Sequence, residues 1–286
     1  MYQFPIGVML ESFRLPTPEA IKKAAELGTA GIQMYCTKGA HAPENMTPAA
    51  RREILDMVKS EGLCFSAICG DLGGGFGNPE LNPERIEKSK RILDLALELE
   101  TNVVTTHIGV VPTDPSHERY KIMQDACGQL AEYADSIGAH FAIETGPETS
   151  AVLKTFLDSL GGSKGVGVNL DPANLVMVAG DDPVVAVHTL KDYIVHTHAK
   201  DGVMLQRGNP EYIYGVAHPV PEELQGIRYF AEMPLGQGNV HFDTYLRALD
   251  EIGFHGFLTI EREVGNDPVG DIRTAAEHLR SIMAQG

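Results

Sequence analysis

Residues 194–202 read "IVHTHAKDG", a stretch that begins as an apolar strand and ends in titratable side chains. Side chains alternate between the two faces of a strand, so His196, His198 and Lys200 share one face. The opposite face carries Val195 and smaller residues. The stretch therefore predicts a buried strand with one face that becomes more polar towards its carboxyl end.

Seven other short apolar segments are similar to this one, and amphipathic segments with helical spacing lie between them. The eight predicted strands cover residues 5–10, 31–36, 64–70, 102–109, 140–146, 165–171, 193–201 and 256–263. Continuous apolar strands that alternate with helices are typical of an α/β protein with a parallel sheet covered by helices. Eight units at a spacing of about 30 residues favour a (β/α)8 TIM barrel, a single domain over residues 1–286. An open doubly wound sheet is the alternative, but no GxGxxG turn follows the first strand.

Two of the helical segments carry clear start signals. Thr17 precedes Pro18, and Thr47 precedes Pro48. A threonine followed by proline at the first helical position is typical of a helix N-cap. We therefore expect Thr17 and Thr47 to cap the helices that follow them.

The chain between the seventh predicted strand and the next helix is unusually long. Residues 202–241 form this insertion, which mixes glycine, proline and aromatic residues. Long insertions in compact domains are usually functional lids or binding loops. We expect the insertion either to cover part of the barrel mouth and become ordered on ligand binding, or to serve as a surface or oligomer contact.

The composition is that of a soluble protein with an acidic surface. Of 286 residues, 43% are hydrophobic and 22% are charged, and the formal net charge is −16. Nucleic acids and anionic membranes attract basic surfaces, so this charge argues against both as partners. No secretion signal and no apolar run of about 20 residues is visible. The four cysteines form no CxxC pair, so we expect reduced thiols in a cytoplasmic protein. We also expect a homo-oligomer, either a dimer or a tetramer.

Four consecutive strands in the second half of the chain end in polar residues on the inward face. In a TIM barrel the carboxyl ends of all strands open onto one mouth, where catalytic residues gather. The polar residues at these ends are Glu144, Asp171, His198 and Glu261. Three neighbouring carboxylates repel one another unless a cation neutralises them, so the set predicts one divalent metal ion. Oxygen-rich ligation with one imidazole favours the harder ions.

Each of these residues alone also has an ordinary structural explanation. Asp171 could anchor the turn at Pro172, and the two glutamates could be rim charges paired with lysine or arginine. A histidine on a strand is more often a hydrogen-bonded structural residue, which is the role expected for His196, deeper in the barrel. The convergence of all four residues is what favours a metal site.

Six motifs in a fixed order extend this interpretation to a family. They are "THIG" (106–109), "AIETG" (142–146), "NLDPANL" (169–175), "HTHAKDG" (196–202), "PLGQGNVHF" (234–242) and "LTIERE" (258–263). With these motifs the sequence resembles the xylose-isomerase-like TIM-barrel superfamily, specifically the sugar phosphate isomerase/epimerase group. The resemblance runs from the first strand to the last helix.

The resemblance implies a role for the polar strand ends. In ketose 3-epimerases of this group, strands five to eight supply Glu, Asp, His and Glu to one Mn²⁺ or Co²⁺. The matching positions here are Glu144, Asp171, His198 and Glu261, and Glu263 is a weaker match for the last. We expect one Mn²⁺ ion, with Co²⁺, Mg²⁺ and Zn²⁺ as alternatives.

Four further residues are predicted to bind substrate. His107 and Lys200 lie at strand ends on the inward face, and Glu148 follows the "ETG" turn. The resemblance adds Asn174, which occupies the position of a substrate-binding histidine in the ketose epimerases. For Lys200 the structural alternative is an ion pair, for example with Asp201.

Metal and carboxylates together predict proton transfer next to a carbonyl of a sugar or keto-sugar. The metal would stabilise an enediolate, and Glu144 and Glu261 would remove and return the proton as catalytic residues. The predicted activity is isomerisation or epimerisation, and a dehydratase or lyase of the same superfamily is the first alternative. A nuclease resembling endonuclease IV is disfavoured by the acidic net charge. A non-catalytic sugar-binding barrel is also disfavoured, because carboxylates that bind a metal have little function in simple sugar binding.

Overall fold

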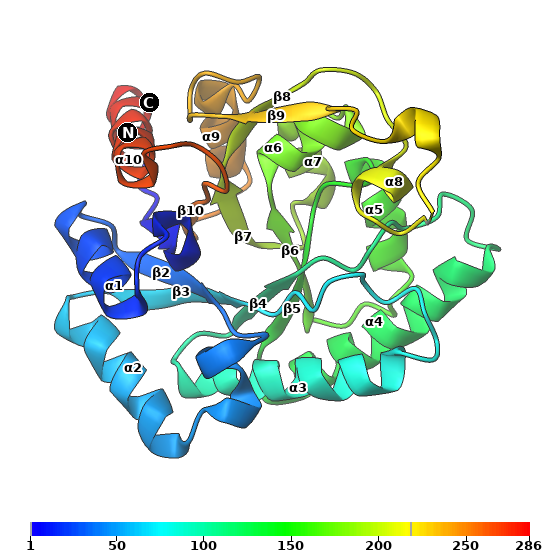
Figure 1. The fold of residues 1–286 in the computed structure, drawn as a ribbon, viewed down its shortest axis with the longest axis horizontal. Helices are drawn as coiled ribbons and strands as arrows, with labels where there is room; N and C mark the ends of the chain where they lie inside the picture. Colours follow the sequence, from blue (N-terminus) through cyan, green and yellow to red (C-terminus); the bar gives the residue numbers. More distant parts are fainter. Residues whose placement is uncertain (1, 218) are drawn as a thin grey trace.

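The computed structural model describes residues 2–217 and 219–286, and its centre is a closed barrel of eight parallel strands (Figure 1). The order around the barrel is β1-β10-β7-β6-β5-β4-β3-β2. Its strands are β1 (Ile6–Met9), β2 (Gly31–Tyr35), β3 (Cys64–Cys69), β4 (Val103–Thr106), β5 (His140–Glu144), β6 (Val166–Leu170), β7 (Ile194–Ala199) and β10 (Leu258–Ile260). The predicted TIM barrel is confirmed, and each of the eight predicted strands contains one observed strand.

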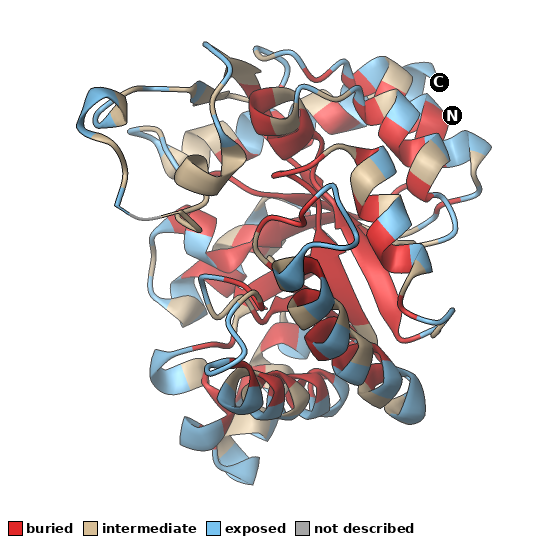
Figure 2. Ribbon diagram, turned by 90° about the vertical axis from the view of Figure 1, so that its right-hand side faces the viewer, coloured by how far each residue is buried: buried red, intermediate tan, exposed pale blue. Residues whose placement is uncertain are grey.

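The helices lie outside the barrel, with their apolar sides against the strands (Figures 1 and 2). They are α1 (Thr17–Glu26), α2 (Pro48–Ser60), α3 (Asn82–Glu98), α4 (Glu118–Ile137), α5 (Ser150–Asp158), α7 (Pro183–Leu190), α9 (Phe242–Glu251) and α10 (Pro268–Gln285), while the short α6 (Pro172–Asn174) lies at the carboxyl end of β6. Figure 2 shows buried strands at the centre and exposed residues on the outer sides of the helices. Continuous apolar strands are therefore buried on both faces, as parallel sheets require.

The two predicted helix caps have different outcomes. The Thr47 side chain accepts a hydrogen bond from the Ala50 backbone N–H at 3.2 Å, which confirms it as the N-cap of α2. Thr17 is instead the first helical residue of α1, after Pro16 at the N-cap position. The Thr17 prediction is therefore wrong by one residue, because a proline on each side of Thr17 already fixes the backbone that enters the helix.

The insertion between β7 and α9 has secondary structure of its own. Strands β8 (Asp201–Met204) and β9 (Phe230–Met233) pair as a two-stranded antiparallel sheet, and the short helix α8 (Pro210–Ile213) lies between them. This small sheet lies beyond the carboxyl end of the barrel, beside α8 (Figure 1). Each of its strands has only four residues, too few for a reliable alternation pattern in the sequence.

One buried carboxylate fixes the base of the insertion. The two oxygens of Asp201 accept hydrogen bonds from the backbone N–H groups of Gly202, Gly236, Gly238 and Val240, at 2.8–3.0 Å. A Cβ atom at Gly238 would lie 2.1 Å from Asp201 Oδ1, so only glycine allows this approach. The two ends of the insertion are thereby held by one side chain.

Within the described ranges, no helix has both the length and the apolar character that crossing a bilayer demands.

Candidate metal centre and its cavity

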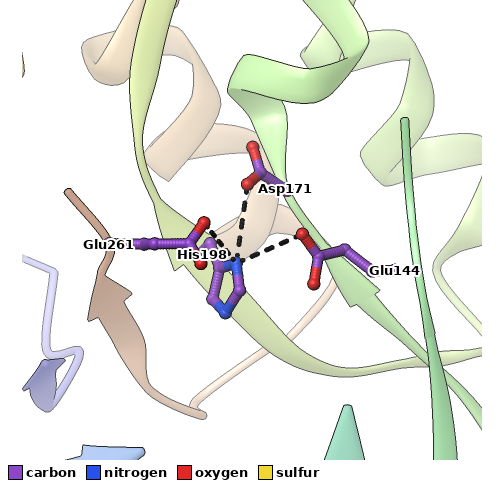
Figure 3. A group of neighbouring side chains, drawn as sticks. All are labelled: Glu144, Asp171, His198 and Glu261. Carbon is purple, nitrogen blue, oxygen red and sulfur yellow. Dashed lines mark ion pairs between the residues drawn. The ribbon is translucent and has the colours of Figure 1, made fainter. Parts of the chain in front are cut away.

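Four buried side chains meet at the carboxyl ends of neighbouring strands (Figure 3). Glu144 ends β5, Asp171 follows β6, His198 lies in β7 and Glu261 follows β10. One ligand atom from each of these side chains lies within 4.8 Å of the others. The four predicted metal ligands are therefore brought together, and we refer to them as the quartet.

The quartet is arranged around the Nδ1 atom of His198. This atom lies 3.6 Å from Glu144 Oε1, 3.5 Å from Asp171 Oδ2 and 3.4 Å from Glu261 Oε2. Within the described part of the chain, His198 Nδ1 and Asp171 Oδ2 are buried and have no hydrogen-bond partner. Ligands held by one ion at about 2.0–2.2 Å lie at such separations from each other, so the donor set fits a divalent ion.

Gln33 contacts the side of the His198 ring that faces away from the carboxylates. Gln33 Oε1 lies 3.0 Å from His198 Nε2 and accepts a hydrogen bond when that nitrogen is protonated, while Asn169 Nδ2 lies 3.3 Å from the same nitrogen. The Gln33 amide is oriented in turn by Thr105, to which it donates at 2.8 Å. In the neutral ring with its proton on Nε2, the lone pair on Nδ1 would face the space between the three carboxylates, as a metal-binding histidine needs.

The charges of the quartet are strongly coupled. Burial opposes a charged His198, but the carboxylates of Glu261 and Glu144 outweigh burial and raise its pKa well above the usual range. Burial also opposes ionisation of Glu144, yet the imidazoles of His107 and His198 hold the pKa of that carboxyl low. Burial raises the pKa of Glu261 although Lys200 opposes the shift. A proton or a metal cation beside Nδ1 is what balances the three carboxylates.

A second group of buried polar residues supports the quartet from deeper in the barrel. His196 Nδ1 lies 2.8 Å from Asn169 Oδ1, and His196 Nε2 lies 2.9 Å from Thr259 Oγ1. Burial lowers the pKa of His196 well below its usual range, so the ring is neutral. Asn169 also donates to Glu144 Oε2 at 3.1 Å. We call this group the support network, and its members are Gln33, Thr105, Asn169, His196 and Thr259.

Three of the four predicted substrate-binding residues line the cavity above the quartet. His107 Nε2 lies 3.4 Å from Glu144 Oε1, and Asn174 Nδ2 donates to the same oxygen at 3.1 Å. Lys200 Nζ lies 2.9 Å from Glu261 Oε2 and also pairs with Glu263. The alternative ion pair between Lys200 and Asp201 is not formed, because the Asp201 carboxylate binds backbone N–H groups.

The fourth predicted residue, Glu148, lies outside this cavity. It lines a separate cavity of about 550 Å³ and accepts a hydrogen bond from the Val111 backbone N–H at 3.2 Å. Burial raises the pKa of its carboxyl to about 8. Glu148 follows the turn after β5, and its carboxylate contacts the loop that follows β4.

The cavity above the quartet measures about 220 Å³ and includes residues that the sequence patterns missed. Tyr35 and Asp71 come from the ends of β2 and β3, and an inward polar residue just after a strand is a signal that could have identified Asp71. Tyr214 and Phe230 come from the insertion, where no periodic pattern pointed to them. The Tyr214 ring packs against His107 at 5.6 Å between centroids, and burial raises the pKa of its hydroxyl, which therefore stays protonated.

Comparison with known proteins places this geometry among related barrels. The family model described as "Xylose isomerase-like TIM barrel" matches residues 21–282. A solved xylose isomerase domain protein from Planctomyces limnophilus is 23% identical, with a TM-score of 0.79 and coverage of 99% of this chain and 98% of that one. A 3-keto-D-glucoside 4-epimerase from E. coli is 17% identical, with a TM-score of 0.72 and coverage of 98% and 100%.

A sequence relative of named function is similar to part of the chain. An inosose dehydratase from Lacticaseibacillus casei is 27% identical over 152 residues, which are 53% of this chain and 48% of that protein. The matched region is thus about half of either protein, whereas the structural similarity extends over the whole barrel.

Proposed function

This chain belongs to the xylose isomerase-like TIM barrel family, and we propose that it is a divalent-metal-dependent isomerase or epimerase of a sugar or keto-sugar. The observation that carries the proposal is the convergence of three buried carboxylates on His198 Nδ1, an atom that has no hydrogen-bond partner among the described residues. Acidic groups concentrated in a cavity at the carboxyl ends of barrel strands are typical of an active site.

The quartet would hold the metal ion. Three carboxylate oxygens and one imidazole nitrogen suit Mn²⁺, with Co²⁺, Mg²⁺ and Zn²⁺ as alternatives. The ion supplies a Lewis acid that lowers the free energy of negative charge on a substrate oxygen. Gln33 keeps the imidazole in the required tautomer, while Asn169 and Asn174 fix the orientation of Glu144.

Glu144 and Glu261 would transfer the proton. They come from β5 and β10, which are separated in the barrel by β6 and β7, so they approach a bound carbon from different sides. Removal of a proton by one carboxylate and its return by the other inverts a stereocentre. Return to the neighbouring carbon would instead interconvert aldose and ketose. Such general acid–base help is typically worth about 10²–10⁴ in rate.

The insertion would act as a cover for the reaction. Its residues Ile213, Tyr214 and Phe230 form part of the cavity wall, and excluding water strengthens electrostatic interactions with a developing negative charge. The protonated Tyr214 hydroxyl can donate a hydrogen bond to a substrate oxygen. Strand β9 is held against the barrel by Glu232, which pairs with Arg262 at 2.6 Å.

A dehydratase is the second candidate, and Lys200 favours it. Loss of a hydroxyl group from an enolate needs a proton donor, and the Lys200 ammonium lies in the cavity beside Glu261. The similarity of half the chain to an inosose dehydratase supports this candidate as well.

Deuterium uptake tests the proposal and separates its two forms. The protein, loaded with Mn²⁺ or Co²⁺, is incubated in D₂O with free ketoses, ketose phosphates, inososes and keto-glycosides. Deuterium at a carbon next to the carbonyl, with an isomeric product, supports the isomerase or epimerase. A product lighter by one water supports the dehydratase. An absence of exchange for every compound, with a metal-loaded site, would contradict both.

A further inference from the structure

The cavity above the quartet is small, and a larger cavity adjoins it. The quartet cavity measures about 220 Å³, below the roughly 300–1,000 Å³ that is usual for small-molecule sites. The adjoining cavity measures about 630 Å³. Tyr35 and Asp71 line both cavities, so the two spaces meet at these side chains. We call the second space the outer cavity.

The outer cavity lies over the carboxyl ends of β1, β2 and β3. Its wall combines the ring of Tyr35 and the aliphatic Leu72 with polar groups that bind hydroxyls, among them Glu11 and Thr37. An aromatic ring that presents an apolar face and a polar tip suits a ligand with both kinds of surface. A sugar ring, with its C–H faces and its rim of hydroxyls, is such a ligand.

The charges of the outer cavity disfavour an anionic ligand. Its carboxylates are Glu11 and Asp71, which repel phosphate and accept hydrogen bonds from hydroxyl groups. The Lys88 ammonium already pairs with Glu44 at 3.4 Å. Burial lowers the pKa of His41, so this ring is neutral at pH 7. Among the described lining residues, Lys38 is the one cation that forms no ion pair, and a single cation is fewer than a phosphate clamp uses.

We propose that the outer cavity binds an uncharged sugar unit or aglycone attached to the reacting ring, so that the preferred substrate is a keto-glycoside. This inference rests on the proposed function, because the reacting ring must lie above the quartet. The glycosidic bond would pass between Tyr35 and Asp71, the two side chains shared by the cavities.

The cavity that contains Glu148 provides a comparison on the other side of the mouth. It measures about 550 Å³, close to the outer cavity in size. Val178 is the one residue that its described lining shares with the quartet cavity, and this side chain is apolar. It offers no polar group at the junction to orient a linked sugar, so we assign the second unit to the outer cavity.

A comparison of kcat/KM values tests the inference. Exchange rates of the metal-loaded protein are measured with free ketoses, ketose phosphates, inososes and keto-glycosides. We expect the best keto-glycoside to exceed the best free sugar by at least about tenfold, the gain from one well-placed subsite. A free sugar, an inosose or a ketose phosphate as the best substrate would overturn the inference and leave the proposed function intact. An absence of exchange with all compounds would instead remove the proposed function, and the inference with it.

A pair of matched variants locates the subsite. Leu72→Trp narrows the outer cavity, and Val152→Trp places the same ring at a half-buried aliphatic residue in the cavity near Glu148. We expect Leu72→Trp to lower kcat/KM for the keto-glycoside by about tenfold or more through KM, with little change for a free sugar. Val152→Trp should leave both values near the parent. Equal losses for both substrates in Leu72→Trp, or a glycoside-specific loss in Val152→Trp, would contradict the assignment.

Discussion

The quartet and the support network are both polar and both buried, but their hydrogen bonds are completed to different extents. Both ring nitrogens of His196 have partners within the support network. In the quartet, His198 Nδ1 and Asp171 Oδ2 have no hydrogen-bond partner among the described residues. Buried polar atoms are seldom left unpaired. The difference shows that two histidines two residues apart on one strand can serve separate purposes, one in support and one in binding.

The largest effect is expected from removing charge in the quartet. With saturating Mn²⁺, Glu144→Gln and Glu261→Gln should each lower the exchange rate by about 10²–10⁴, because an amide cannot accept the proton. Glu263→Gln, two residues beyond Glu261 and exposed, is the matched control and should cost far less. Full turnover of either quartet variant with excess Mn²⁺ would refute the acid–base role of that residue and leave it as a ligand.

A smaller effect is expected where the support network meets the quartet. Gln33→Leu removes the acceptor that fixes the His198 tautomer, and metal affinity should fall by about 10–100-fold. Competition with a chelator of known affinity measures the change. Thr105→Val removes only the group that orients Gln33, so its loss should be smaller. If the metal affinity of Gln33→Leu were unchanged, Gln33 would have no supporting role in metal binding by His198.

A change confined to the support network should affect stability instead of metal binding. His196→Leu leaves Asn169 Oδ1 and Thr259 Oγ1 without their imidazole partner, so the free energy of unfolding should fall by about 1–3 kcal/mol. Urea unfolding of the metal-free protein measures this loss. Metal affinity should change less than in Gln33→Leu. A larger effect on affinity than on stability would place His196 with the binding residues.

The last expected effect appears only when the pH is changed, and it concerns Glu148, a buried carboxyl outside both groups. Its pKa of about 8 in the folded protein exceeds the ordinary value of 4.5, so the folded state holds more protons between these pH values. Stability should therefore fall as pH rises from about 4.5 to about 8, by up to about 1.4 kcal/mol per pH unit. Glu148→Gln should flatten this slope in thermal or urea unfolding. A parallel slope in the variant would show that other groups cause it.

The sequence was sufficient to predict the barrel, because every strand is a short apolar run between amphipathic segments. The predicted strands were longer than the observed ones at their carboxyl ends, as in β10, where Glu261 and Glu263 follow the last paired residue. The side chains of polar residues just beyond a strand still alternate between its two faces, although their backbone no longer pairs with the neighbouring strands. That alternation is also why the quartet could be located before its geometry was known.

The remainder of the site depends on contacts between segments that no local period records. Gln33 is an inward residue of β2 whose role emerges only when β7 is close to it in the barrel. Tyr214 reaches the cavity from the insertion, whose path is set by the Asp201 hydrogen bonds and by ion pairs such as Arg119 with Glu211. Glu148, which follows the turn after β5, lines a different cavity, and its substrate-binding role stays a prediction.

The Asp201 carboxylate makes the insertion an exchangeable module. Because both ends of the segment are bonded to one side chain, the distance between them is fixed independently of the residues in the middle. The entropy of closing a loop grows slowly with its length, by only about 0.6 kcal/mol for each doubling. Insertions and deletions between residues 205 and 229 can therefore be tolerated by the barrel while they alter the wall around Ile213 and Tyr214. Selection can retarget such a protein to a new substrate through this one segment, with the reacting groups left in position.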